Sequence, residues 1–274
     1  EERGVRVSQI MQTLDGKLFA EFNNDLFAVF SFVEANYFWP DYDLLISAAK
    51  EIAKMHLGFN SLDDDDFKKI ENFSGQGKGY FNVIKDYDRE DFIKLKDLIK
   101  SKTEQNDTDK LVLGKIDIFL ETCDKIKNYL ERLEKLPKQI IHSDLHPHNI
   151  LVNDKEVKVL IDFDSMRISQ QARDVAFVIY RLGKQFFVNK DLKEVQENAP
   201  KLKDLFVKEY CLVKELTEEE NKLLPVLVKD EFLRKLLFVL KGVYQDNNFA
   251  WAKDLSSFVA SFEEIDYFWP EFKI

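Results

Sequence analysis

The chain has 274 residues, of which 45% are hydrophobic and 33% charged, and its formal net charge is −10. A chain of this length can bury a large core without disulfides, and its negative charge argues against binding to nucleic acid or an anionic membrane. Two widely separated cysteines and the lack of a long apolar run predict a cytoplasmic protein without a membrane span.

The first 34 residues alternate between strand and turn patterns. Asp15-Gly16 and Asn23-Asn24-Asp25 are turn sequences, since these residues tolerate a positive φ angle. The apolar run from Leu26 to Val33 is typical of a buried strand. Together these patterns predict a small antiparallel sheet.

The remainder of the chain is mainly helical, and its low glycine and proline content agrees with this. Amphipathic periodicity and caps predict helices over residues 45–55 (stopped by Gly58), 61–66, 89–102 and 111–136, and over most of the chain from residue 171. Thr217 to Glu220 form a predicted capping box. An extended segment, 139–142, and a hairpin, 150–152 with 157–161, interrupt the helices. The fold class is therefore α+β, with a small β lobe (1–34) and a large helical lobe (35–274).

Two polar clusters follow apolar strands, at 142–149 and 162–164. The first reads His-Ser-Asp-Leu-His-Pro-His-Asn and the second Asp-Phe-Asp. Folding of the hairpin would bring Asp162 close to Asn149. Phosphoryl transfer from ATP needs a carboxylate that accepts the hydroxyl proton and hard oxygen ligands for Mg²⁺. Asp144 as the base, with Asn149 and Asp162 as metal ligands, would meet both needs.

These two segments resemble the catalytic loop and metal motif of aminoglycoside phosphotransferases, choline kinases and related small-molecule kinases. Asn149 follows Asp144 by five residues and Asp162 follows it by eighteen, as in the catalytic and metal motifs of protein kinases. The resemblance implies a two-lobed protein-kinase-like fold that uses ATP and Mg²⁺ to phosphorylate the hydroxyl of a small molecule.

The resemblance also suggests roles for residues around the two motifs. It places Leu151 under the adenine ring and Ile161 beside the nucleotide. Backbone groups of a hinge at Ser31, Phe32 and Val33 would pair with adenine. Three supporting residues complete the predicted site: His142, His146 and Asp174.

The N-terminal region departs from the family pattern. Only 30 residues precede the hinge, and neither a phosphate-covering glycine loop nor an ATP-anchoring lysine is found among them. Either the sequence is a fragment of a longer chain, or the protein lacks the lysine clamp. The second case keeps open a kinase-like module that binds nucleotide without turnover.

A metal-dependent hydrolase is the other alternative, because His142, Asp144, His146 and His148 alternate and include zinc-ligand types. Pro147 disrupts the strand that would align them. Gly75 to Gly79 is predicted to be a flexible loop, since no strand precedes it and no Ser or Thr follows its Lys.

The acceptor is not specified by any motif. The acidic balance and two Tyr-Phe-Trp-Pro segments, 37–40 and 267–270, favour a cationic or amino-bearing alcohol. The same segments would equally serve as plugs of the core. Arg167, just after the metal motif, would touch substrate or phosphate, or be an ordinary exposed arginine. The oligomeric state is not indicated.

Overall fold

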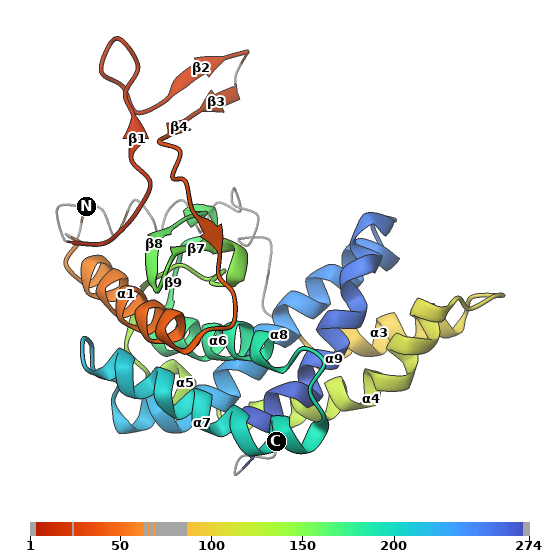
Figure 1. Cartoon of the computed structure of the whole chain (residues 1–274). Coiled ribbons are helices and arrows are strands. Elements are labelled where there is room, and N and C mark those ends of the chain that lie inside the picture. Colours follow the sequence, from red (N-terminus) through yellow and green to blue (C-terminus); the bar gives the residue numbers. More distant parts are fainter. Residues whose placement is uncertain (1–3, 24, 63–64, 66–67, 69–86, 271–274) are drawn as a thin grey trace.

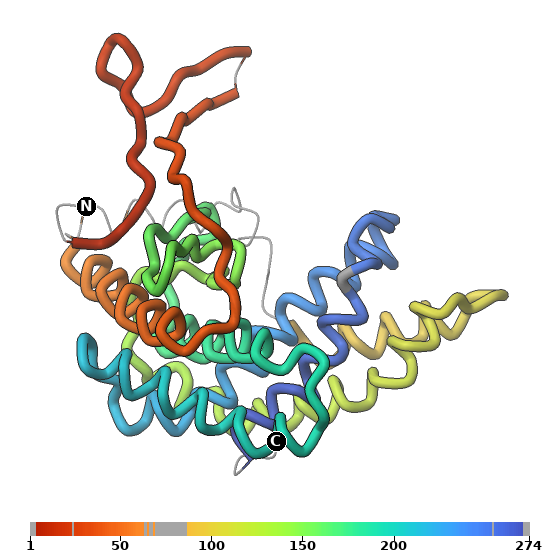
Figure 2. The backbone as a smooth tube through the Cα atoms, in the orientation of Figure 1, coloured from red at the N-terminus to blue at the C-terminus, as the bar shows by residue number. Residues whose placement is uncertain are grey.

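The computed structural model describes residues 4–23, 25–62, 65, 68 and 87–270 (Figure 1, Figure 2). Half of the helix predicted over residues 61–66 and the whole loop predicted over residues 75–79 lie outside the described residues. The described helices include none that is both long and apolar enough to cross a lipid bilayer.

The N-terminal arm, residues 10–30, consists of two separate antiparallel strand pairs. β1 (Ile10–Met11) pairs with β4 (Val29–Phe30), and β2 (Ala20–Phe22) pairs with β3 (Asp25–Phe27). The arm projects from the body of the molecule, as the red ribbon of Figure 1 shows. The sequence predicted strands in this region. The prediction that they form a single small sheet was wrong, because the two pairs are not joined to each other.

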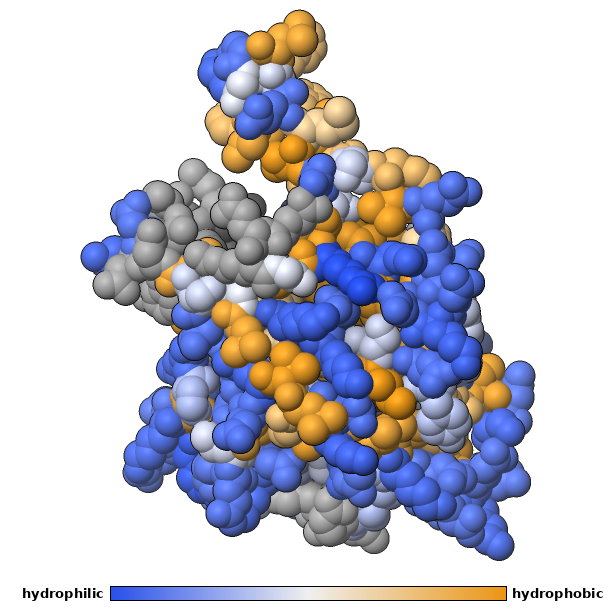
Figure 3. Space-filling model, turned by 60° about the vertical axis from the view of Figure 1, so that its left-hand side comes forward, coloured by the Kyte–Doolittle hydropathy of each residue, from blue (hydrophilic) through white to orange (hydrophobic). Residues whose placement is uncertain are grey.

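Burial of the run from Leu26 to Val33 was also predicted wrongly. Leu26, Phe27, Val29 and Phe30 are between 51% and 66% exposed. A two-stranded ribbon has no second layer of its own, so its apolar side chains remain at the surface. Figure 3 shows the resulting hydrophobic atoms on the projecting arm.

Two further small sheets carry the polar clusters. β5 (Asn36–Tyr37), β7 (Ile150–Asn153) and β8 (Glu156–Leu160) form an antiparallel sheet in that order, which confirms the predicted hairpin. β6 (Lys138–Ile141) pairs with β9 (Arg167–Gln170), a strand that was not predicted. β6 leads into one polar cluster and β8 into the other.

Helices make up the body below these sheets (Figure 1). They are α1 (Tyr42–Asn60), α3 (Arg89–Lys100), α4 (Asp107–Lys127), α5 (Leu130–Glu134), α6 (Gln171–Gly183), α7 (Leu192–Cys211), α8 (Glu218–Tyr244) and α9 (Ala252–Phe268). Side chains of Asp41, Asp88, Asn106, Asp191 and Thr217 cap five of them at the N-terminus. Each cap satisfies backbone amides that the helix itself leaves unpaired.

Two helix boundaries differ from the prediction. The helix expected over 111–136 is divided into α4 and α5, and the capping box of Asn106 starts α4 before Leu111. α1 continues past Gly58 to Asn60, so that glycine is not the stop.

The second Tyr-Phe-Trp-Pro segment belongs to the core. Phe268 and Trp269 are 1% and 3% exposed, and the Phe268 ring packs edge-on against Tyr180 of α6. In the first segment Phe38 is 5% exposed whereas Tyr37 is 60% exposed. The core-plug interpretation therefore accounts for the second segment and for Phe38.

Candidate active site

The catalytic loop, residues 142–149, begins where β6 ends and leads through a short 3-10 turn, η1 (Pro147–Asn149), into β7. Ser143 and Asp162 adopt left-handed φ angles of 69° and 64°. For residues with a side chain this conformation costs about 1–2 kcal/mol, and such strain concentrates at functional sites. The contacts around the loop hold it in this shape.

Asp174, in the first turn of α6, is the main brace of the loop. Its carboxylate accepts hydrogen bonds from the backbone nitrogens of His142 (2.7 Å) and Ser143 (2.9 Å). The His56 ring, Nε2 at 3.2 Å, is its third partner, and the other His56 nitrogen lies 2.8 Å from the Tyr210 hydroxyl. The residue is 1% exposed, so these bonds replace all contact with water. This placement matches the supporting role expected for Asp174.

His142 connects the catalytic loop to the strand that precedes the metal motif. Its Nε2 lies 2.9 Å from the Ile161 carbonyl, which can only accept, so Nε2 carries the proton. Its Nδ1 then accepts from the backbone nitrogen of Asp144 (3.3 Å). Burial lowers the pKa of His142 from its ordinary value. A neutral imidazole therefore joins the two polar clusters.

The Asp144 carboxylate lies between two basic side chains. Oδ1 accepts from Lys235 Nζ of α8 at 2.8 Å, and Oδ2 lies 3.4 Å from His146 Nε2. Burial alone would raise the pKa of Asp144, but the charge of Lys235 and the contact with His146 outweigh it and lower that pKa. The carboxylate, whose side chain is 17% exposed, is thus charged at neutral pH and remains accessible.

Asn149 and Asp162 meet across the β7–β8 hairpin. The backbone nitrogen of Ile161 donates to the Asn149 carbonyl at 3.1 Å, and Asn149 Nδ2 donates to the Asp144 carbonyl at 2.9 Å. With its nitrogen bound to the loop, Asn149 offers Oδ1 as a metal ligand. Among the described residues, none makes a hydrogen bond or ion pair with the Asp162 carboxylate. These are hard oxygen donors, the type that Mg²⁺ prefers, so the two residues fit that ion.

The same contacts weigh against a zinc hydrolase. Both ring nitrogens of His142 have partners within the protein, and His146 Nδ1 accepts from the backbone nitrogen of His148. In the part of the chain that the structure describes, no three His, Cys, Asp or Glu side chains are placed to share an ion. The ring nitrogens of His142 and Nδ1 of His146 thus make hydrogen bonds that hold the catalytic loop in shape.

The predicted nucleotide contacts lie on strand β7, directly after β8 and directly after β4. Leu151 is in β7, where it pairs with Tyr37 of β5, and Ile161 directly follows β8. Both are partly buried. Ser31 is tied to Gln9, whose carbonyl accepts from the Ser31 nitrogen at 2.7 Å, whereas Phe32 is 92% exposed.

Lys235 was missed by the sequence analysis. It lies 91 residues from Asp144 in the chain, and no motif links the two. The available signal was a run of charges, from Lys229 to Glu231 and at Lys235, within an otherwise apolar helix. Charged residues are rarely buried unless they are paired, so such a run indicates partners elsewhere in the fold.

The chain is similar to a known protein family and to several solved structures. Residues 1–199 match the model of a family described as "Phosphotransferase enzyme family". A spectinomycin phosphotransferase in its AMP-bound complex is similar in structure, with a TM-score of 0.67 at 15% identity over 96% of this chain and 79% of that chain. No curated protein sequence matches the chain.

Two other solved structures have related folds. A microcompartment-associated aminopropanol kinase gives a TM-score of 0.61 at 15% identity, over 98% of this chain and 77% of that one. For the Plasmodium vivax ethanolamine kinase the TM-score is 0.56 at 14% identity, over 96% and 70%.

The fold and the family match thus place the chain in the class of phosphotransferase-family proteins with a protein-kinase-like fold. The chain belongs to the phosphotransferase enzyme family that its first 199 residues match, which confirms the resemblance found in the sequence.

Proposed function

We propose that this protein transfers the γ-phosphoryl group of ATP to a hydroxyl of a small molecule. The observation that carries the proposal is Asp144: a carboxylate that Lys235 keeps charged, in a loop that also presents Asn149 and lies beside Asp162. The membership of the family supports phosphoryl transfer as the reaction class.

Asp144 orients the acceptor and takes its proton. A charged carboxylate is a strong hydrogen-bond acceptor, so it aligns the hydroxyl oxygen with the phosphorus that it attacks. The new bond forms between that oxygen and the γ-phosphorus, and the bond from phosphorus to the β–γ bridging oxygen breaks. The hydroxyl proton passes to Asp144 and then to solvent, and ADP leaves. Because its pKa is low, Asp144 accepts this proton late in the transfer.

Asn149 and Asp162 would hold Mg²⁺ through Oδ1 and the carboxylate. When bound, the ion would neutralise charge on the phosphates. His142 keeps the two ligands in register, since one imidazole bonds to the strand end before Asp162 and to the loop that carries Asn149.

ATP would lie between the segment 1–34 and the remainder of the chain, 35–274. The backbone at 31–33 would pair with adenine, and Leu151 and Ile161 would pack against the ring. The acceptor would be an amino-bearing alcohol, which agrees with the net charge of −10 and with the acceptors named for the aminopropanol and ethanolamine kinases. Cys123 and Cys211 are free thiols, as expected in the cytoplasm.

The first test replaces the base. Asp144→Asn should lower kcat by about 10²–10⁴, the usual contribution of a positioned general base, with little change in ATP affinity. ADP release over a panel of alcohols measures turnover, and calorimetry measures nucleotide binding. Asp154→Asn is the matched control, because Asp154 lies in the β7–β8 turn at a left-handed φ of 49° that asparagine tolerates. Unchanged turnover in Asp144→Asn would refute the assignment.

The second test removes a metal ligand. Asp162→Ala should abolish the Mg²⁺-dependent part of ATP binding, because one of the two protein ligands is lost. Titrations of ATP with and without Mg²⁺ separate this part from metal-independent binding. If the wild-type protein binds Mg·ATP but produces no ADP with any alcohol, it is a nucleotide-binding module instead.

A further inference from the structure

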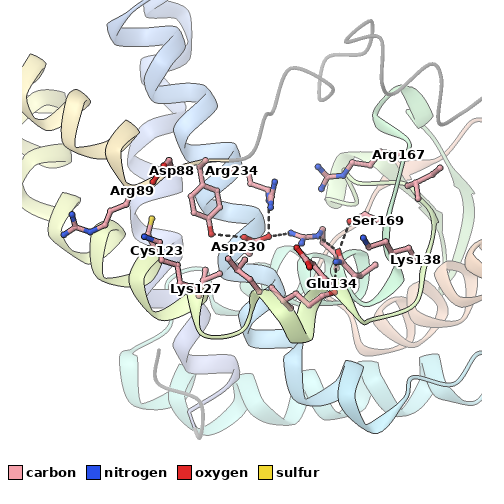
Figure 4. A pocket seen from close by; sticks show the side chains of 17 residues that line it. Asp88, Arg89, Cys123, Lys127, Glu134, Lys138, Arg167, Ser169, Asp230 and Arg234 are labelled. Carbon is pink, nitrogen blue, oxygen red and sulfur yellow. Dashed lines mark hydrogen bonds and ion pairs between the residues drawn. The ribbon is translucent and has the colours of Figure 1, made fainter.

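A cavity of about 530 Å³ lies between the α3–α4 pair, the β6–β9 pair and α8. Figure 4 shows its lining, with the dashed network of Asp230 at the centre and Arg167 at one side. Six basic residues line it, namely Arg89, Lys127, Lys138, Arg167, Arg173 and Arg234. Such a concentration of cations is unexpected in a protein whose net charge is −10.

The inner wall contains three guanidinium groups and only two carboxylates. Arg173 Nη1 lies 2.6 Å from Asp230 Oδ2 and 3.2 Å from Glu231 Oε2. Arg234 Nε lies 3.0 Å from the same Asp230 oxygen, and Arg167 Nη2 lies 2.6 Å from the same Glu231 oxygen. Burial would raise the pKa of both acids, but the arginines lower each to about 2. Both acids are therefore charged, and the network keeps one surplus positive charge.

Two members of this network, Arg167 and Glu231, are incompletely satisfied, and Glu231 Oε1 is buried without a hydrogen-bond partner among the described residues. The Arg167 side chain is 15% exposed, so it is not the ordinary surface arginine considered from the sequence. Its Nε is buried and has no hydrogen-bond partner in the described part of the chain. A buried guanidinium donor without an acceptor is costly. An anionic group in the cavity would balance the surplus charge of the network.

The other cations of the lining are placed differently. Arg89 and Lys127 lie near Asp124, at 3.0 Å and 4.0 Å, so this one carboxylate offsets part of their charge. Lys138, at the start of β6, makes no ion pair with any described residue. It is exposed and adds positive charge on the β6–β9 side of the cavity. The acids Asp88 and Glu134 also line the cavity and would suit an amino group.

The cavity and the catalytic loop share two elements. Arg167 pairs in register with Ile141, the last residue of β6 before the loop. On α8, Arg234 lines the cavity while the next residue, Lys235, donates to the Asp144 carboxylate. A small molecule bound at Arg167 is thus positioned along the β6 strand that leads to the proposed base.

We propose that this cavity holds the acceptor through a carboxylate or phosphate group that Arg167 binds and the charge of Lys138 attracts, while its hydroxyl reaches Asp144. The inference rests on the proposed phosphoryl transfer and narrows its acceptor. The amino-bearing alcohol proposed above would then also carry an anionic group.

Matched acceptor pairs that differ only in the anionic group test this inference. Serine is compared with ethanolamine, homoserine with 3-aminopropanol, and glycerol 3-phosphate with glycerol. The first two pairs probe a carboxylate and the third a phosphate. We expect kcat/KM to be at least about tenfold higher for the anionic member of one pair, since a charge-assisted hydrogen bond contributes about 1.5–3 kcal/mol. Equal or better use of the uncharged or cationic members would overturn the inference.

Two variants assign the effect to the cavity. Arg167→Gln and Lys138→Met should each raise KM for the anionic acceptor, about tenfold or more for Arg167→Gln, and leave KM for ATP and for the partner acceptor unchanged. Lys135→Met is the control, because Lys135 is exposed, pairs with Glu131 and lies outside the lining. If Arg167→Gln does not fold, Lys138→Met decides, as it removes an exposed side chain. An equal loss for both members of a pair would contradict the proposal.

Binding measurements separate this inference from the proposed reaction. Thermal shifts are recorded for the same pairs with a non-hydrolysable ATP analogue. A shift with the anionic members alone, without ADP formation from ATP, supports the cavity and refutes turnover. Turnover that Asp144→Asn abolishes, without preference for the anionic members, retains the reaction and refutes the cavity assignment.

Discussion

At the scale of single residues, Lys235 sets the electrostatics of the proposed base. Lys235→Met removes the strongest of the influences that lower the pKa of Asp144, so this pKa should rise toward its ordinary value. The acid limb of the kcat profile should then move to higher pH, while the carboxylate stays charged at neutral pH. Lys222→Met on the same helix is the control, since it breaks only an exposed pair with Glu218. An unmoved acid limb would contradict this role.

Asp174 offers a residue-scale test of the loop brace. Asp174→Asn replaces a carboxylate that accepts two backbone bonds with an amide that presents donors on one side. We expect the free energy of unfolding to fall by about 1–3 kcal/mol, the cost of unsatisfied buried donors. Urea unfolding measures it. Asp117→Asn, at a side chain 78% exposed, should change stability by less than about 0.5 kcal/mol; an equal loss in both variants would exclude the brace.

The site residues proposed on the catalytic loop rest on residue types and local spacing. Asp144, Asn149 and His142 lie within eight consecutive residues, so one strand and one turn determine how they meet. Asp162 could be added because a short hairpin brings it back. Lys235 and His56 could not, since each comes from a distant helix and only tertiary packing brings it to the loop.

At the scale of elements, Gly183 tests the contact between α6 and the end of α9. A Cβ at Gly183 would overlap the Phe268 ring. Gly183→Ala should therefore destabilise the protein by about 1–3 kcal/mol through overpacking, although alanine is the better helix former. Gly114→Ala in α4 is the matched control, because the described residues, apart from the nearby backbone of α4 itself, place no heavy atom within 4 Å of an added Cβ. It should stabilise by about 0.5–1 kcal/mol, as thermal unfolding would show. Stabilisation by both changes would contradict the packing argument.

Caps and apolar periodicity predicted the helices reliably. Edge strands could not be predicted in this way. The capping box at Thr217 begins α8 as predicted, because a cap is a local interaction. β9 was missed since Arg167 to Gln170 has no apolar alternation: it forms by pairing its backbone with β6. The break between α4 and α5, at Asn128 and Tyr129, carries no proline or glycine to announce it.

At the scale of the whole molecule, burial of the N-terminal arm could not be predicted from its sequence. An apolar run shows that a strand can be buried, but a second layer must cover it. In the described structure Phe27 and Phe30 are 51% and 56% exposed on the projecting arm. The helical body behaves differently, because helices far apart in the chain, such as α1 and α7 or α6 and α8, cover one another's apolar faces.

The buried ion network makes the stability of the whole molecule depend on acid pH. Asp230 and Glu231 have folded-state pKa values of about 2, against ordinary values of 3.8 and 4.5. A lowered folded pKa contributes stability that is present above the ordinary value and is lost as pH falls through the folded value. The free energy of unfolding should therefore decrease from about pH 4.5 down to about 2, as the three arginines lose their partners. Urea unfolding at a series of pH values measures this slope.

A pair of variants attributes that slope to the network. Asp230→Asn should lower stability at pH 7, since it removes the charge of the carboxylate that Arg173 and Arg234 share, and should flatten the acid slope. Glu219→Gln, which breaks only an exposed pair with Arg132, should leave the slope unchanged. A slope equally steep in Asp230→Asn would mean that other carboxylates control acid unfolding. The same two acids balance the cations of the cavity. Asp230→Asn should therefore also tighten binding of the anionic acceptor, so that the free energy of unfolding at pH 7 falls while the affinity for the acceptor rises.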